Sequence, residues 1–117
     1  MEFSEGQIWK IRTGEFSGAD IYLHKILSHD VIGNSFHISV PSEGISHMPF
    51  SQLALEQSGL EFLSVATNLG DDWQEGFELW REEFLKGRAG VFSVTVSDAI
   101  NLLFDTKETG EDIAAID

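Results

Sequence analysis

Four large aromatic side chains recur at helical spacing in the second half of the chain, and they constrain its fold more than any other feature. They follow one another at intervals of four, three and four residues, which matches the period of an α-helix. The four are Trp73, Phe77, Trp80 and Phe84. Because burying one Phe-sized side chain contributes about 1.5–3 kcal/mol, the stripe predicts an amphipathic helix that packs its rings inward and turns its carboxylates outward.

The first third of the chain predicts β-strands. Apolar and polar side chains alternate over residues 7–12, 21–28 and 36–40, with turn-forming residues between these stretches. Three successive antiparallel strands joined by short turns are the simplest assembly. We expect the aromatic helix to pack on apolar side chains of this sheet. These are Trp9, Ile11, Leu23 and Ile38.

Two further helices are expected. A short one covers residues 53–57 and ends at the following serine and glycine. Thr95 and Asp98 have the spacing of a capping box, in which a hydroxyl and an acid three residues later satisfy two backbone amides, and they predict a helix near residues 97–105. The apolar residues at 60–63 fit a strand or a helix equally well.

Together these elements predict an α+β domain. We expect an N-terminal antiparallel sheet of three or four strands, packed on one face by two main C-terminal helices. One globular domain covers residues 1–105, and residues 106–117 form a frayed acidic tail. A chain of 117 residues is too short for a second domain of ordinary size.

The balance of charge excludes several functions. The chain has 20 acidic and 7 basic residues, a formal net charge of −13, and residues 49–117 carry 14 of the acids and 4 of the bases. Nucleic-acid binding is not expected, because phosphate backbones call for clustered Lys and Arg. Such a field instead speeds encounter with a basic partner. No apolar run approaches the roughly 20 residues of a membrane helix, so no membrane partner is expected.

The residue types of catalysis and metal binding form no known pattern here. The chain has no cysteine, which excludes disulfides and thiolate metal sites. None of the four histidines has the spacing of a metal site, and we expect them on strand faces, half in water. They are His24, His29, His37 and His47. Glycine-rich phosphate loops and serine-hydrolase motifs are also missing. We therefore expect no enzyme, no metal and no cofactor.

The N-terminal residues and the absence of cysteine bear on localisation. The first six residues are acidic and lack the apolar segment of a signal peptide. A chain without cysteine fits the reducing cytosol. We therefore expect a cytoplasmic protein.

Two stretches resemble a group of small bacterial proteins of unknown function. The segment from Trp80 to Phe92 is similar to a W-R-x-x-F-x-x-G-x-A-G-V-F pattern, and His47-Met48-Pro49-Phe50-Ser51, followed by Ala54-Leu55, accompanies it. The resemblance implies an α+β domain and a bacterial source, and it supplies no catalytic residues. In size and acidity the chain is also similar in type to immunity proteins that neutralise secreted toxins.

These observations predict a non-enzymatic domain that binds a protein through its acidic helical half. In its sharpest form it is an immunity or inhibitor protein that recognises a basic partner. The contact row is then Glu75, Glu78 and Glu82, of which the last two lie four residues apart and repel each other.

Two alternatives stay open. One is a structural subunit or homodimer, joined through the sheet face that no helix covers. The other is a small ligand-binding or enzymatic domain that uses His24, His37 or Tyr22 beside a pocket. The sequence does not identify a partner, an oligomeric state or a pathway.

Overall fold

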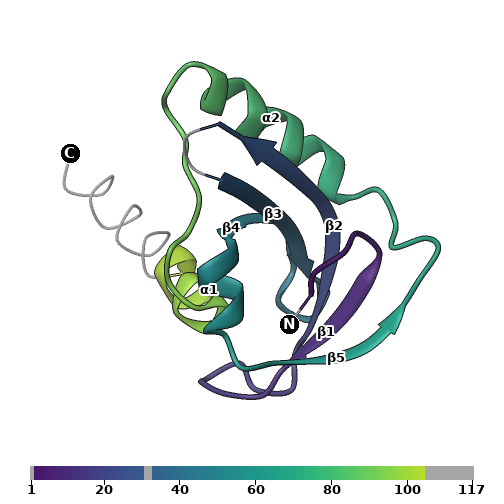
Figure 1. The fold of residues 1–117 in the computed structure, drawn as a ribbon. Helices are drawn as coiled ribbons and strands as arrows, with labels where there is room; N and C mark the ends of the chain where they lie inside the picture. The colour runs from purple at the N-terminus through teal and green to yellow at the C-terminus, as the bar shows by residue number, and fades with distance from the viewer. Residues whose placement is uncertain (1, 31–32, 105–117) are drawn as a thin grey trace.

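The computed structural model describes residues 2–30 and 33–104, and a five-stranded antiparallel sheet forms its centre (Figure 1). The spatial order of the strands is β4-β3-β2-β1-β5, so the first four follow one another across the sheet and the last returns to pair with β1. The strands are β1 (Gln7–Ile11), β2 (Asp20–His29), β3 (Gly33–Val40), β4 (Ile45–Ser51) and β5 (Leu60–Val65). The predicted α+β class is confirmed, and the three predicted strands correspond to β1, β2 and β3.

Helical segments connect and cover the strands. They are the 3-10 turn η1 (Pro41–Glu43), α1 (Gln52–Glu56), α2 (Trp73–Leu85) and the helical residues 96–104. Ser51 caps α1, because its Oγ accepts the Ala54 amide at 3.2 Å. Thr95 Oγ1 accepts the Asp98 amide at 3.2 Å, as the capping-box spacing predicts.

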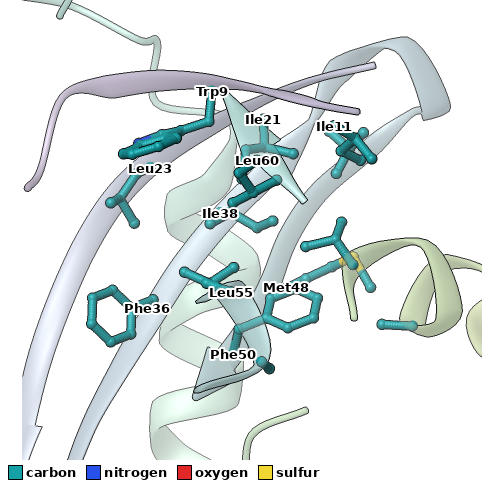
Figure 2. Packing of buried hydrophobic residues seen from close by; sticks show 14 of the residues in the cluster. Trp9, Ile11, Ile21, Leu23, Phe36, Ile38, Met48, Phe50, Leu55 and Leu60 are labelled. Atoms are coloured by element: carbon teal, nitrogen blue, oxygen red, sulfur yellow. The ribbon is translucent and has the colours of Figure 1, made fainter. Parts of the chain in front are cut away.

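The main hydrophobic core lies on one face of the sheet, which we call the aliphatic face because most of its residues are aliphatic, although Trp9, Phe36 and Phe50 also belong to it (Figure 2). Cross-strand neighbours such as Leu23, Ile38 and Met48 are almost fully buried there. Helix 96–104 adds Val96, Ala99 and Ile100 to the same cluster, and α1 adds its own buried residues. This face is therefore filled by α1 and helix 96–104.

The aromatic helix α2 covers the opposite face. The ring centroids of Phe77 and Trp80 lie 4.8 and 4.6 Å from that of His37. His37 stands between Phe36 and Ile38 on β3, and successive side chains of a strand point to opposite faces. The expectation that both main helices pack on one face is therefore wrong, as is the packing of α2 on Trp9, Ile11, Leu23 and Ile38. Helix 96–104 and α1 already occupy the aliphatic face, so the aromatic stripe packs on the histidines.

The two outer strands extend the sheet beyond the predicted three or four strands. Residues 60–65 form β5, which resolves the ambiguity of that segment. β4 contains Pro49, whose missing amide is tolerated because β4 lies at the edge of the sheet. The predicted tail, residues 106–117, lies outside the described residues. Within the described part of the chain, no helix has the length and apolar character needed to cross a membrane.

The helix α2 lies close to the sheet at Gly76. A Cβ at this position would lie 2.9 Å from the Cβ of His47, which is fixed to the backbone of β4 and cannot swing away. Glycine inside a helix costs about 1 kcal/mol relative to alanine. The close contact between α2 and β4 explains why the helix carries glycine at this position.

We expect Gly76→Ala to lower the free energy of unfolding by about 1 kcal/mol, although alanine is the better helix former. The clash with His47 costs about 1–3 kcal/mol, more than the gain in helix propensity. Urea denaturation measures the difference, with Gln74→Ala on the exposed side of α2 as the matched control. A Gly76→Ala protein more stable than the wild type would show that α2 does not pack this closely on β4.

Candidate functional site

All four histidines lie on the sheet face beneath α2. His24 and His29 belong to β2, His37 to β3 and His47 to β4. Each has a ring centroid within 6.4 Å of an aromatic ring of α2. The expectation of strand-face histidines half in water is confirmed for His24, His29 and His47, which are half-buried, and is wrong for His37, which is fully buried.

Hydrogen bonds link three of the histidines, two of them through one serine and the third directly. Ser35 Oγ lies 2.8 Å from His29 Nε2 and 2.8 Å from His37 Nε2. His37 Nδ1 lies 2.9 Å from His47 Nε2. Both nitrogens of the buried His37 ring are thus satisfied, as a buried polar side chain requires. A continuous polar chain runs across β2, β3 and β4 beneath the helix.

The fourth histidine has a separate hydroxyl partner. His24 Nε2 lies 2.8 Å from Ser39 Oγ, and the ring stacks on Trp73 with centroids 5.1 Å apart and planes inclined by 13°. A bulge in the β2–β3 pairing lies at this point, between Leu23 and Lys25. His24 therefore marks the end of the polar face near the N-terminus of α2.

The aromatic stripe packs over the polar chain, and within it Phe77 and Trp80 are buried whereas Trp73 and Phe84 are half-buried. Its rings contact imidazoles rather than aliphatic side chains, as the Phe84–His29 centroid distance of 4.6 Å shows. Trp80 is fixed further because its Nε1 donates to the Gly90 carbonyl at 2.8 Å. The sequence correctly predicts that these rings turn inward, and the structure shows that they cover a polar surface.

Burial changes the protonation of the imidazoles. Desolvation lowers the pKa of His24 from its usual 6.5 to about 4. Desolvation, helped by the charges of His47, His29 and Lys25, lowers the pKa of His37 to about 3. Desolvation also lowers the pKa of His47. These three rings are therefore neutral at pH 7.

The buried part of this network has the chemistry of a structural element. A reactant cannot touch His37, because its exposed fraction is zero. Across residues 2–30 and 33–104, no three His, Asp or Glu side chains are grouped so that they could hold a metal ion. The imidazoles form the surface on which α2 packs.

A pocket opens where the polar face reaches solvent. It has a volume of about 360 Å³, and Tyr22 and His24 line it together with Ser39 and Trp73. Asp72 adds one carboxylate, and neither lysine nor arginine is among the lining residues. Of the three residues that the sequence suggested beside a pocket, Tyr22 and His24 reach this one and His37 does not.

The predicted contact row lies on the outward side of α2. Glu75, Glu78 and Glu82 are all exposed, and they follow the helical period on the side away from the aromatic stripe. Leu79 lies among them with 59% of its surface exposed. Leu79 was not predicted as part of this row, although its position four residues after Glu75 places it there.

Comparison with models of protein families, with curated proteins and with solved structures finds no match to this chain. The resemblance to small bacterial proteins therefore stays a prediction.

We expect stability to fall as the pH drops from 7 to 5. The pKa of His37 is about 3 in the folded protein and near 6.5 in the unfolded chain, so the unfolded chain binds more protons throughout this range. His37 alone accounts for about 2 kcal/mol at pH 5, and above about pH 7.5 its contribution no longer changes.

Urea denaturation across this range measures the effect, and His37→Phe is the informative variant. It should lose up to about 2 kcal/mol of the difference between pH 7 and pH 5, because one proton-binding group of the unfolded chain is gone. An unchanged pH dependence in His37→Phe would contradict the assignment of a buried neutral imidazole.

Proposed function

We propose that this chain binds another protein through the outward face of α2, with Glu75, Glu78 and Glu82 around Leu79 as the contact surface. The observation that carries the proposal is an exposed leucine within a row of exposed carboxylates. Interfaces combine an apolar anchor with a polar rim, and this row has both. A basic partner with an apolar recess complements it.

Charge compensation within the row is weak. Glu78 has a cation nearby in Arg81, but the Nη1–Oε2 distance is 3.9 Å and both side chains are more than half exposed. Such a pair contributes little in water. A lysine or arginine from a partner would relieve the repulsion between Glu78 and Glu82, which lie four residues apart on the helix. The net charge of −13 would also speed the approach of such a partner.

The packing beneath α2 supports a role in recognition. Aromatic contacts along the whole helix hold it on the sheet, from Trp73 on His24 to Phe84 on His29. The contact row is therefore ordered before a partner arrives, and binding loses less conformational entropy. An immunity or inhibitor protein acting on a basic toxin is the sharpest form of this proposal, since size, acidity and a preformed acidic surface all suit it.

We expect the triple variant E75Q/E78Q/E82Q to bind its basic partner about 3–150-fold more weakly. Each exposed charge contact contributes about 0.2–1 kcal/mol, so three together contribute about 0.6–3 kcal/mol. The tagged chain is used to capture proteins from its source cells at about 50 and 500 mM salt, and the affinity of a captured basic protein is then measured by calorimetry.

The matched control is E2Q/E15Q/E56Q, which changes the net charge equally and leaves α2 untouched. This control variant should bind the partner at low salt as the wild type does. High salt should release the partner from the wild type. Leu79→Ala should weaken binding without changing its dependence on salt. Equal affinity of the two triple variants, or an affinity that does not respond to salt, would contradict the proposal.

The pocket beside His24 supports a second candidate function, the binding of a small molecule. Its volume of about 360 Å³ falls within the range of ligand sites, and it combines the Trp73 indole with polar groups from Tyr22 and Ser39. With Asp72 as the charged lining residue, the site favours a neutral or cationic ligand over an anion.

We expect neutral or cationic aromatic fragments to quench the fluorescence of Trp73, and anionic fragments of similar size to leave it unchanged. Tyr22→Phe should weaken the binding of a fragment about five-fold, the effect of one lost hydrogen bond, while Glu75→Gln on the outward row should not. A fragment set that leaves the fluorescence unchanged at millimolar concentration would rule out this candidate.

A further inference from the structure

The strand β5 forms one border of the sheet (Figure 1). It pairs with β1 on one side, and within residues 2–30 and 33–104 no strand pairs with its other side. Every second residue of such a strand directs its amide and carbonyl away from the sheet. Unpaired backbone groups in a row are a template for another strand.

The side chains of β5 are unusually apolar for a free edge. Phe62, Leu63 and Val65 are 47%, 38% and 67% exposed. Sheet edges are commonly protected by lysine, by proline or by inward-pointing charge. β5 has one charged residue, Glu61, and it lies near the start of the strand. The edge therefore lacks lysine and proline, although the β1–β5 pairing has one bulge, between Ile8 and Trp9 of β1.

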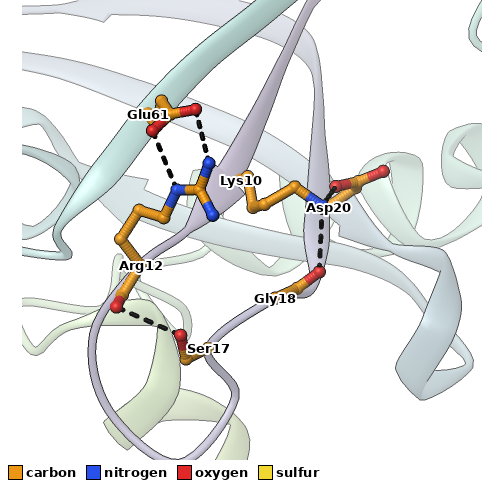
Figure 3. Close-up of polar contacts among 6 residues, drawn as sticks. All are labelled: Lys10, Arg12, Ser17, Gly18, Asp20 and Glu61. Atoms are coloured by element: carbon orange, nitrogen blue, oxygen red, sulfur yellow. Dashed lines mark hydrogen bonds and ion pairs between the residues drawn. The ribbon is translucent and has the colours of Figure 1, made fainter.

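The charges next to this edge cancel one another (Figure 3). Glu61 accepts from Arg12 Nε at 2.9 Å and from Nη2 at 2.6 Å. On the neighbouring strands, Lys10 Nζ lies 3.1 Å from Asp20 Oδ1. The local balance is neutral, in a molecule whose net charge is −13. A basic partner gains no electrostatic attraction at this edge, whereas another acidic molecule meets little repulsion here.

We propose that two copies of this chain pair through β5, antiparallel and about a two-fold axis, so that one sheet continues across both molecules. Two identical strands satisfy each other in this arrangement, because a two-fold interface uses the same patch on each copy. Backbone hydrogen bonds join the strands, and Phe62, Leu63 and Val65 lose exposed apolar surface. The sheet faces over β2, β3 and β4 are already occupied, because α2 packs on one and helix 96–104 with α1 packs on the other.

The small number of residues in β5 limits the affinity of the proposed dimer. β5 has six residues, fewer than the roughly 20–30 residues that each partner contributes to an ordinary stable interface. The dimer therefore forms reversibly and depends on protein concentration. It leaves the contact row on α2 free, since that row lies on a different element.

Sedimentation of the full chain between about 5 and 500 µM tests the proposal. The mass should rise with concentration from 13.0 kDa towards twice that value. Val65→Lys should raise the dissociation constant of the dimer at least about tenfold, because it replaces an apolar contact of the interface with a charge of the kind that keeps edge strands apart. Leu85→Lys is the matched control, since Leu85 is also highly exposed but lies at the end of α2.

Single cysteines give a second readout that does not require a destabilising charge. The chain has no cysteine of its own, so every disulfide between two copies reports the introduced residue. Among Phe62→Cys, Leu63→Cys and Ser64→Cys, the position nearest the two-fold axis should cross-link several-fold more than Leu85→Cys, because facing residues in antiparallel strands lie within disulfide range.

The response to salt separates this dimer from the binding of a basic partner. Raising the salt from about 50 to 500 mM should leave the affinity of the dimer unchanged or increase it, because salt screens the repulsion between two acidic molecules. The same increase in salt should lower the affinity of α2 for a basic partner. A monomer at every concentration, or equal cross-linking at residues 62–64 and 85, would overturn the proposal. It would leave the proposed function of α2 standing.

Discussion

The contact between the aromatic rings of α2 and the imidazoles of the sheet face determines the arrangement of the rest of the molecule. Phe77 and Trp80 pack edge-on against His37, and the rings at the two ends of α2 cover His24 and His29. This contact buries imidazoles, and burial keeps them uncharged at neutral pH. A charged histidine in the same place would repel its neighbours and draw water beneath the helix. The packing and the protonation therefore depend on each other.

The two faces of the sheet have different packing requirements. The aliphatic face needs only apolar side chains of suitable volume, which α1 and helix 96–104 provide. The histidine face needs partners for every buried nitrogen, and Ser35 provides them for two rings at once. The hydrogen bonds orient the imidazoles, and the aromatic rings of α2 pack against the oriented imidazoles. The outward row of carboxylates on α2 is held in place as a result.

Local patterns predicted the individual elements, but not which face each helix covers. The spacing of Trp73 to Phe84 correctly predicts α2 and its inward rings, and Thr95 correctly predicts the start of the last helix. Choosing the face requires knowing which other segment fills the aliphatic side, and that depends on contacts between distant parts of the chain. The alternation of Phe36, His37 and Ile38 already placed this histidine opposite the aliphatic core. It is the signal that could have revealed the polar face.

The other differences have similar causes. The sequence does not predict β4, because its Pro49 normally argues against a strand. Proline is tolerated here because β4 lies at the edge of the sheet. The pocket beside His24 combines β2, β3 and the first turn of α2, so no local pattern predicts it. The exposed glutamates were predictable, because their places follow directly from the helical period once the aromatic rings are turned inward.

The most direct test of this account is a set of nuclear Overhauser contacts from the side-chain rings of α2. The account expects cross-peaks from the rings of Phe77 and Trp80 to the imidazole protons of His37, whose ring centroids lie 4.8 and 4.6 Å away. Cross-peaks from those rings to the methyl groups of Ile11, Leu23 and Ile38 would place α2 on the aliphatic face and contradict the account.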